Sequence, residues 1–111
     1  MNWMVKSGDV TTYQYRLVGK TMTVTWFLTT TTIAGTPDST LRIRIPGGFI
    51  AARRTRVPYV RLNKTEYAEA VAEVPEGGTT INLYRDLTTN RNWTQEKNLT
   101  EVYGQITFEV R

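Results

Sequence analysis

The sequence contains no cysteine and no histidine. Without cysteine, the chain can form neither a disulfide framework nor a thiolate metal site. Without histidine, it lacks the commonest general base and the commonest zinc ligand. Catalytic triads that use histidine are therefore excluded, and we expect no metal and no cofactor.

Long apolar runs and a strong charge imbalance are also missing. No stretch approaches the roughly 20 apolar residues that a membrane-spanning helix needs, and the first residues, MNWMVKSGD, lack the apolar centre of a secretory signal. The net charge is only +4, whereas nucleic-acid-binding surfaces usually show clustered basic residues interleaved with aromatics. We therefore expect neither membrane insertion nor a nucleic-acid partner.

The composition is that of one globular domain rich in threonine. The chain has 111 residues, of which 40% are hydrophobic and 22% charged, close to ordinary globular usage. Threonine occurs in clusters such as TTTT at residues 29–32, and its β-branched side chain favours strands over helices. We expect a single all-β domain over residues 1–111.

Alternation of apolar and polar residues is the signal that repeats along the chain. Residues 20–29, KTMTVTWFLT, predict a strand with one buried face, and residues 13–19, YQYRLVG, predict a strand before it. Gly19-Lys20 is a two-residue turn signal between them. The side chains expected to face the core from the second strand are Met22, Val24, Trp26 and Leu28.

Several further strands follow the same pattern. A helix is the alternative for EYAEAVAEV, because alanine and glutamate are good helix formers, but the alternation of its apolar residues favours a strand. Turn residues predict a loop at 30–39, and a polar run predicts a long loop at 88–100. Together these segments predict an antiparallel, jelly-roll-like β-sandwich of seven to eight short strands. The further strands are expected at residues 41–45, 53–61, 66–74, 79–87 and 101–111.

The carboxylates are scattered and form no recognisable catalytic motif. A retaining glycosidase needs two carboxyl groups about 5 Å apart, whereas Glu69 and Glu73, on one face of a strand, would lie about 13 Å apart. Nucleotide-binding, serine-hydrolase, zinc-protease and calcium-loop motifs are also missing. We expect a non-enzymatic protein, with a carboxylate-pair glycosidase as the remaining enzymatic alternative.

Arginine side chains form the first candidate site. The segment LRIRIPGG at residues 41–48 places Arg42 and Arg44 on an outward strand face. If strand 41–45 neighbours strand 53–61, these arginines form one basic patch with Arg53, Arg54, Arg56 and Arg61, able to bind carboxylates or phosphates. Cross-strand or cross-subunit ion pairs with Glu69 and Glu73 are the alternative.

Aromatic residues form the second candidate site. Exposed tryptophan and tyrosine side chains stack on sugars or anchor protein interfaces. Trp93, in the polar loop, is the first candidate for ligand contact, and loop packing is its alternative role. Trp3 is a candidate for a subunit interface. The secondary ligand candidates are Tyr59, Tyr84 and Tyr103.

Two segments carry a resemblance to a known family. Residues 13–51 contain a strand pair with a Gly-Lys turn, an alternating strand, a Gly-Thr-Pro loop and a strand ending in IPGG. Residues 102–111, VYGQITFEVR, form a G-x-I-x-F-x-V strand. This combination resembles the modules at the C-terminal ends of bacteriophage tail fibres and related virion receptor-binding proteins. The matching residues are Tyr13, Tyr15, Gly19, Lys20, Gly35 to Pro37, Ile45 to Gly48, Gly104, Ile106, Phe108 and Val110.

The resemblance implies a β-sandwich that forms a homotrimer about a three-fold axis and binds polysaccharide or protein on the host cell surface. It implies a virion protein made in the host cytoplasm and acting outside the cell, with residues 1–111 as the excised tip of a longer fibre. In such a trimer, Arg42 and Arg44 would pair with carboxylates of a neighbouring subunit, because buried charge is costly unless it is paired.

The leading hypothesis is therefore a non-catalytic module for receptor binding and trimer assembly. One alternative is a monomeric carbohydrate-binding module that uses Trp93 and the tyrosines as a stacking platform. Another is a virion structural or decoration protein that contacts only other proteins. The loop at residues 88–100 is the expected target-facing segment, since recognition is often carried by loops on a rigid scaffold.

Overall fold

The computed structural model describes residues 2–111 as eight β-strands and two single-turn 3-10 helices. The all-β antiparallel fold predicted from the sequence is confirmed. The elements are β1 (Asn2–Met4), η1 (Ser7–Asp9), β2 (Val10–Val18), β3 (Thr21–Ala34), β4 (Thr40–Arg44), η2 (Pro46–Gly48), β5 (Thr55–Asn63), β6 (Glu66–Val74), β7 (Thr80–Tyr84) and β8 (Glu96–Glu109).

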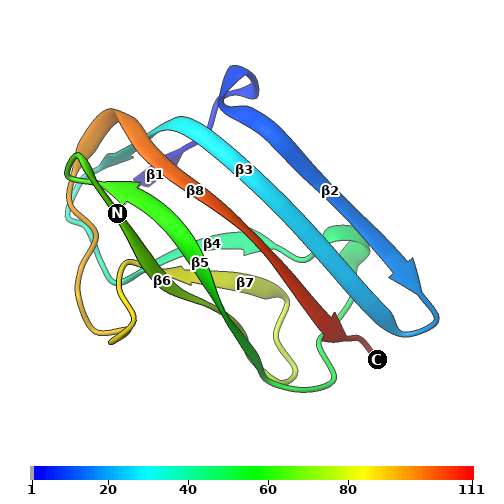
Figure 1. Cartoon of the computed structure of the whole chain (residues 1–111). Coiled ribbons are helices and arrows are strands. Elements are labelled where there is room, and N and C mark those ends of the chain that lie inside the picture. Colours follow the sequence, from blue (N-terminus) through cyan, green and yellow to red (C-terminus); the bar gives the residue numbers. More distant parts are fainter. Residues whose placement is uncertain (1) are drawn as a thin grey trace.

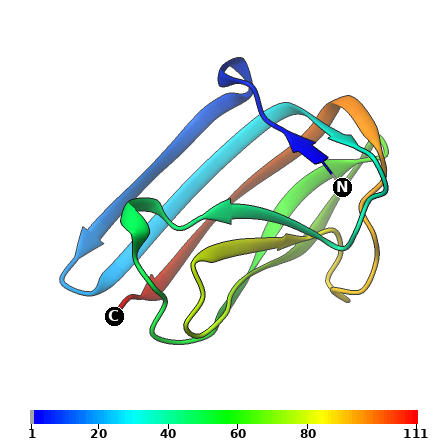
Figure 2. The same ribbon diagram turned by 180° about the vertical axis from the view of Figure 1, so that it is seen from behind.

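The strands form one continuous sheet that curls into a nearly closed, barrel-like sandwich. The hydrogen-bonded order is β1-β3-β8-β5-β6-β7-β4, and β2 pairs with the first half of β3. In Figure 1, β2, β3, β8 and β5 lie toward the viewer, with β7 and β4 behind them. Figure 2, from the opposite side, shows β4 and β7 crossing in front of the long strands.

The two 14-residue strands, β3 and β8, form the centre of the sheet. Trp26 on β3 lies opposite Gly104 on β8. A Cβ atom at Gly104 would lie 2.8 Å from the Trp26 ring and 2.7 Å from the Cβ of Tyr59. The absence of a side chain at Gly104 therefore allows the Trp26 indole to pack against the backbone of β8.

Both central strands are longer than the sequence predicts. The prediction of a loop over residues 30–39 is wrong for its first part, because β3 continues to Ala34, and β8 begins within the loop predicted at 88–100. The register shifts near Thr31, which is buried and donates a hydrogen bond to the Thr100 backbone oxygen at 2.6 Å. Because this hydrogen bond satisfies the buried Thr31 hydroxyl, the threonine-rich segment can continue as a strand to Ala34.

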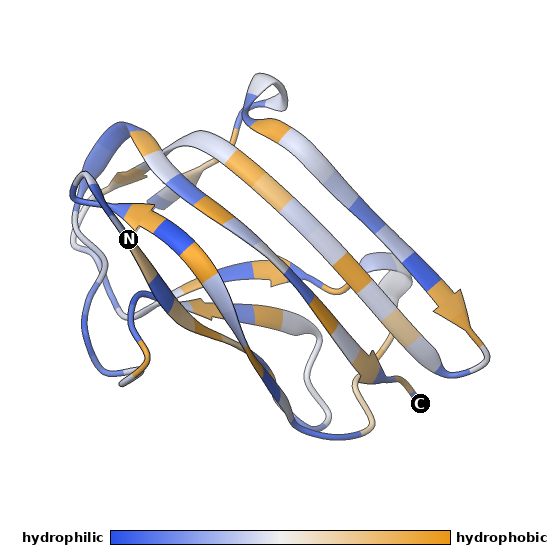
Figure 3. Cartoon of the chain, viewed as in Figure 1, coloured by the Kyte–Doolittle hydropathy of each residue, from blue (hydrophilic) through white to orange (hydrophobic). Residues whose placement is uncertain are grey.

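The core lies between the two layers of the sandwich. The strand over residues 66–74 is confirmed, as is the two-residue turn at Gly19-Lys20. Figure 3 shows alternating apolar and polar residues along the strands, as expected when each strand has one face toward the core. The four residues expected to face the core from the strand at 20–29, Met22, Val24, Trp26 and Leu28, are all buried. Within residues 2–111, no helix is long and apolar enough to span a bilayer.

Candidate functional site

Trp93 lies in the core and not on the surface of the loop. Its side chain is only 2% exposed, and its indole Nε1 donates a hydrogen bond to the Leu83 backbone oxygen at 3.2 Å. Its own amide donates to the Asp38 backbone oxygen at 2.9 Å. The prediction that Trp93 offers an exposed stacking surface is therefore wrong; the loop packs its large apolar ring against the sandwich.

Arg61 is also buried, contrary to the expectation that it joins an outward basic patch. It is 1% exposed, and its guanidinium donates to the backbone oxygens of Arg85 and Glu66 at 2.7 and 2.8 Å. Its Nη2 atom lies 3.1 Å from the Asp86 carboxylate. These partners compensate for the lost hydration of the charge, so Arg61 holds the loop after β7 in place.

Asn63 extends this buried network to the end of the same loop. Its side-chain oxygen accepts hydrogen bonds from the Thr94 amide and from Arg85 Nε, both at 2.9 Å. Its amide nitrogen donates to the Thr94 backbone oxygen and to Glu96 at 3.0 and 3.1 Å. The loop over residues 85–95 is thus tied down by internal hydrogen bonds, which indicates a structural role for its polar groups.

The tyrosine candidates do not come together. Tyr59 is 3% exposed and donates its hydroxyl proton to the Tyr84 backbone oxygen, so the prediction of Tyr59 as a surface contact is wrong. Burial raises the pKa of Tyr59 well above its ordinary value. Tyr84 is half-buried at the end of β7, in the rear layer, whereas Tyr103 is 53% exposed on β8, in the front layer. Of these three residues, only Tyr103 presents an exposed ring.

The arginines of β4 and β5 do not form one patch. The expected adjacency of strand 41–45 and strand 53–61 is wrong, because β4 pairs with β7 and is separated from β5 by β6 and β7. The connecting segment crosses between layers, and Ala51 forms an isolated bridge with Val110 on the way. Arg42 and Arg44 are exposed on β4, and within residues 2–111 neither forms an ion pair.

Arg54 and Arg56 share one carboxylate. Arg54 Nε bonds to Glu73 Oε1, and Arg56 Nε lies 3.2 Å from Glu73 Oε2. Arg56 and Glu73 are direct cross-strand partners between β5 and β6. The geometry is therefore that of the cross-strand ion pairs considered for these residues, and it leaves the pair of arginines with an excess positive charge.

Trp3 packs against the core from β1. It is half-buried, and its Nε1 donates to the Thr31 hydroxyl at 3.0 Å. Thr31 in turn donates to the Thr100 backbone oxygen. This chain of hydrogen bonds joins β1, β3 and β8, so Trp3 has a structural role within one chain whether or not it also contacts a neighbouring subunit.

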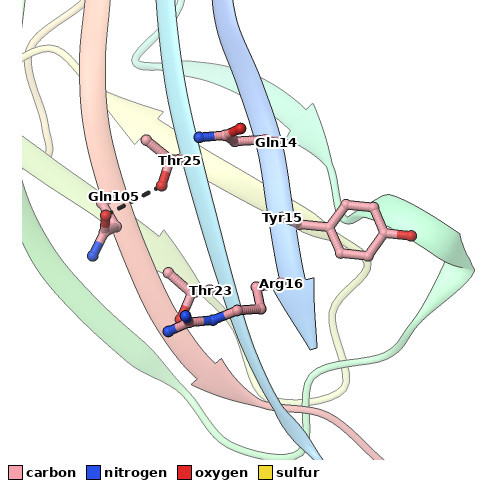
Figure 4. Close-up of a pocket in the computed structure, with 6 residues that line it drawn as sticks. All are labelled: Gln14, Tyr15, Arg16, Thr23, Thr25 and Gln105. Carbon is pink, nitrogen blue, oxygen red and sulfur yellow. Dashed lines mark hydrogen bonds between the residues drawn. The ribbon is translucent and has the colours of Figure 1, made fainter. Parts of the chain in front are cut away.

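The outer face of β2, β3 and β8 carries a polar surface that the sequence reasoning missed. Gln14, Thr25 and Gln105 face one another across the three strands, and Arg16 and Thr23 form the next row. Figure 4 shows these five side chains, with Tyr15 pointing away from them. Together these six residues line a shallow hollow of about 490 Å³. We call it the polar hollow.

The polar hollow offers hydrogen-bonding groups without a carboxylate in its lining. The Thr25 hydroxyl donates to Gln105 Oε1 at 3.1 Å, which leaves the Gln105 amide nitrogen free to donate outward. In the part of the chain that the structure describes, Arg16 forms no ion pair. The hollow can therefore present amide, hydroxyl and guanidinium groups to a ligand.

Aromatic rings border the polar hollow along the same face. Phe27 and Tyr103 are cross-strand partners in the row beyond Thr25 and Gln105. Their rings meet edge to face with centroids 4.9 Å apart, which fixes the exposed Tyr103 ring. The signal for this surface was present in the sequence, at the strand positions that alternate with the core residues.

No family model, curated protein or solved structure matches the chain. Among residues 2–111, no group of three or more acidic side chains is placed to hold a metal ion. The molecule is thus a curled antiparallel sheet with one open polar face, and that face is its best candidate binding surface.

Proposed function

We propose that the protein is a non-catalytic receptor-binding and assembly module of a bacteriophage tail fibre or a similar virion protein. It acts outside the cell as part of the virion, as a homotrimer that attaches to polysaccharide or protein on the host surface. The observation that carries the binding role is the polar hollow with Tyr103 beside it. The resemblance of residues 13–51 and 102–111 to tail-fibre modules supports the assignment to a virion.

The spacing of the polar hollow suits a polyhydroxylated ligand. Neighbouring strands lie about 4.8 Å apart, and residues on one face repeat every 6.8 Å or so along a strand. Hydroxyl groups on neighbouring sugar rings of a glycan can therefore meet neighbouring side chains, with Gln14, Arg16 and Gln105 as donors. The exposed Tyr103 ring adds an apolar surface on which a sugar ring can stack.

The placement of the carboxylates supports a non-catalytic role. Glu73 is held by two arginines, and Glu109, on the outer face of β8, pairs with Arg53 at 2.7 Å. Neither carboxylate lines the polar hollow. Binding at the hollow therefore proceeds without the pair of free carboxyl groups that glycoside hydrolysis uses.

A stand-alone, monomeric carbohydrate-binding module is the alternative function. It would use the same polar hollow and Tyr103, so ligand binding alone does not separate it from a tail-fibre module. Trp93, which is buried, takes no part in either version. The third possibility, a virion structural or decoration protein, predicts no glycan binding at this face.

The test is a binding screen of the purified chain against immobilised bacterial surface polysaccharides. We expect binding that falls at least tenfold in Gln105→Ala and Arg16→Ala, because both remove donors from the hollow. The matched control is Gln95→Ala, an exposed glutamine outside the hollow, which should leave binding unchanged. Binding to whole cells but to no polysaccharide would point to a protein receptor, and equal loss in the control would overturn the site.

A further inference from the structure

A second hollow adjoins the polar hollow along the same three strands. It has a volume of about 510 Å³ and shares Arg16, Thr23 and Gln105 with the polar hollow. Its remaining lining residues are Val18, Thr21 and Thr107. The two hollows therefore form one trough along β2, β3 and β8, with Arg16 in the part that they share. We call it the extended trough.

Hydrogen bonds between strands fix the neutral side chains on the floor of the extended trough. Thr23 and Thr107 are register partners on β3 and β8, and their hydroxyl groups lie 3.0 Å apart in a hydrogen bond. In the next row, Thr25 donates to Gln105. These side chains are therefore held in a fixed array, and only part of their hydrogen-bonding capacity remains for a ligand.

Arg16 supplies a positive charge to the lining of the extended trough. Figure 4 shows its side chain extending from β2 toward Thr23, its register partner on β3. Within residues 2–111, the Arg16 guanidinium forms no ion pair. A guanidinium presents its N–H donors as a rigid fork that matches the two oxygens of a carboxylate. Arg16 is therefore the group of the trough best suited to bind an anion.

The carboxylates of the same face lie outside the extended trough. Among residues 2–111, none lines either of its two hollows. Glu109, near the end of β8, pairs with Arg53 at 2.7 Å, and Glu101 lies further along β8, beyond the exposed Tyr103. The positive charge of Arg16 is therefore not neutralised by the lining of the trough.

We propose that the ligand of the extended trough is an acidic polysaccharide whose sugars carry carboxylate groups, and that Arg16 selects it. This inference rests on the proposed function and names the class of glycan that the module binds. A uronic acid carries its carboxylate directly on the sugar ring, so ring hydroxyls meet the amides and hydroxyls of the trough while the carboxylate binds Arg16. Hydrogen bonds between charged groups are about twice as strong as those between neutral groups, which favours the acidic glycan over a neutral one of the same shape.

Binding of the full chain to polysaccharides with and without their carboxylates tests this selection. The probes are alginate, polygalacturonate and hyaluronate, each immobilised beside its carboxyl-reduced form, in which alcohols replace the carboxylates and the sugar backbone is kept. We expect the wild type to bind at least one native polymer about tenfold more tightly than its reduced form, because charge-assisted hydrogen bonds are lost on reduction. Arg16→Gln should bind both forms about equally, and Arg16→Lys should keep part of the preference because its charge remains.

The matched control is Arg42→Gln. It removes the same charge from an exposed arginine on β4, in the rear layer, that forms no ion pair among the described residues. This variant should keep the wild-type preference for the native polymers, and circular dichroism checks that every variant keeps the fold. An equal loss of preference in Arg42→Gln would show that net charge attracts the polymers and would contradict selection by Arg16.

The other outcomes separate this inference from the proposed function. A preference for the native polymers that persists in Arg16→Gln would overturn the role of Arg16. Equal binding of native and reduced polymers, or binding only to neutral or phosphate-bearing members of the bacterial polysaccharide screen, would overturn carboxylate selection and leave the glycan-binding role standing. Failure to bind any polysaccharide in either set would overturn both.

Discussion

The two ends of the sheet differ in how their polar and apolar groups are satisfied. At the β5–β7 end, the buried Arg61 and Asn63 tie down the loop over residues 85–95, and Trp93 fills the space beneath it. At the β2 end, side chains are exposed on both faces of the strand, and one backbone edge has no partner within residues 2–111. At the first end the buried polar groups have partners within the chain; at the second, side chains and backbone groups are left exposed. We call these the complete end and the incomplete end.

This difference shows that the longest loop of a domain is not always the segment with free groups for binding a ligand. Long loops often carry recognition, but the polar groups of the loop over residues 85–95 form hydrogen bonds within the chain. The free hydrogen-bonding groups and the uncovered apolar side chains lie on a regular strand. A rigid strand face holds such groups in fixed geometry, which lowers the entropy lost when a ligand binds.

The largest expected effect comes from breaking the buried network at the complete end. Arg61→Ala removes the buried guanidinium that bonds to the Asp86 carboxylate and to the backbone oxygens of Arg85, Asn63 and Glu66. We expect the free energy of unfolding to fall by about 3–5 kcal/mol, the usual cost of removing one partner of a buried ion pair. Urea denaturation measures this, with the exposed Arg16→Ala as control. Equal, small effects in both variants would contradict the contrast between the two ends.

A pair of tryptophan substitutions sharpens the comparison on a smaller scale. Trp93 Nε1 donates to the Leu83 backbone oxygen, whereas the buried Trp26 Nε1 has no hydrogen-bond partner among residues 2–111. Trp93→Phe therefore loses packing and one hydrogen bond, and Trp26→Phe loses packing alone. We expect Trp93→Phe to be more destabilising by about 1 kcal/mol, the net value of one hydrogen bond. Thermal or chemical unfolding of both variants gives the difference directly; a reversed order would show that packing at Trp26 dominates.

Asp9, which lies just before β2, should make the stability of the fold depend on pH. Hydrogen bonds from the Lys6 amide and the Thr30 hydroxyl, at 2.9 and 2.7 Å, lower the pKa of Asp9 below its ordinary value of 3.8. The charged form is therefore favoured by folding, and its contribution to stability is present above pH 3.8 and lost as the pH falls through the lower, folded-state pKa.

Melting temperatures measured from neutral pH to below pH 3.8 test the contribution of the Asp9 carboxylate. The wild type should lose more stability on acidification than Asp9→Asn. The asparagine side chain carries no charge at any of these pH values, so its hydrogen bonds do not depend on pH. Parallel curves for the two proteins would mean that other carboxylates account for the acid sensitivity.

The smallest effect is expected within the incomplete end. Tyr15→Ser removes a half-exposed ring that the single chain leaves uncovered, so the stability of the isolated monomer should change by only about 0.5 kcal/mol. Denaturation at concentrations low enough to keep the chain monomeric measures this value. A much larger loss would show that Tyr15 belongs to the core of the single chain, and the two ends of the sheet would then not differ in this respect.

Alternation in the sequence predicted the core-facing row of β3 and the outward positions of Arg42 and Arg44 on β4, because both strands have their apolar residues on the buried side. It failed for β5, whose buried side carries Arg61 and Asn63 while Val60 is 42% exposed on the other. The partners that make this inverted pattern stable, including Asp86 and Thr94, come from a distant loop. Local periodicity contains no information about such partners.

The candidate surfaces were harder to predict than the fold. The polar hollow requires the register of three strands, two of them separated by most of the chain, and Gln105 meets Thr25 only through that register. The burial of Trp93 was hidden by the polarity of its neighbours, whose hydrogen bonds are made elsewhere in the fold. Tyr103, whose exposure was correctly expected, keeps its place as a ligand candidate.

The position of β8 has a consequence for how the protein is made. This last strand lies in the middle of the sheet, between β3 and β5, and pairs Met22 with Phe108. Until residues 96–109 have left the ribosome, the front layer lacks its central strand, and β3 and β5 have no common neighbour. Contacts between residues so distant in sequence form slowly. The sheet can therefore close only after residues 96–109 have been made, and the nascent chain exposes the apolar faces of β3 and β5 until then.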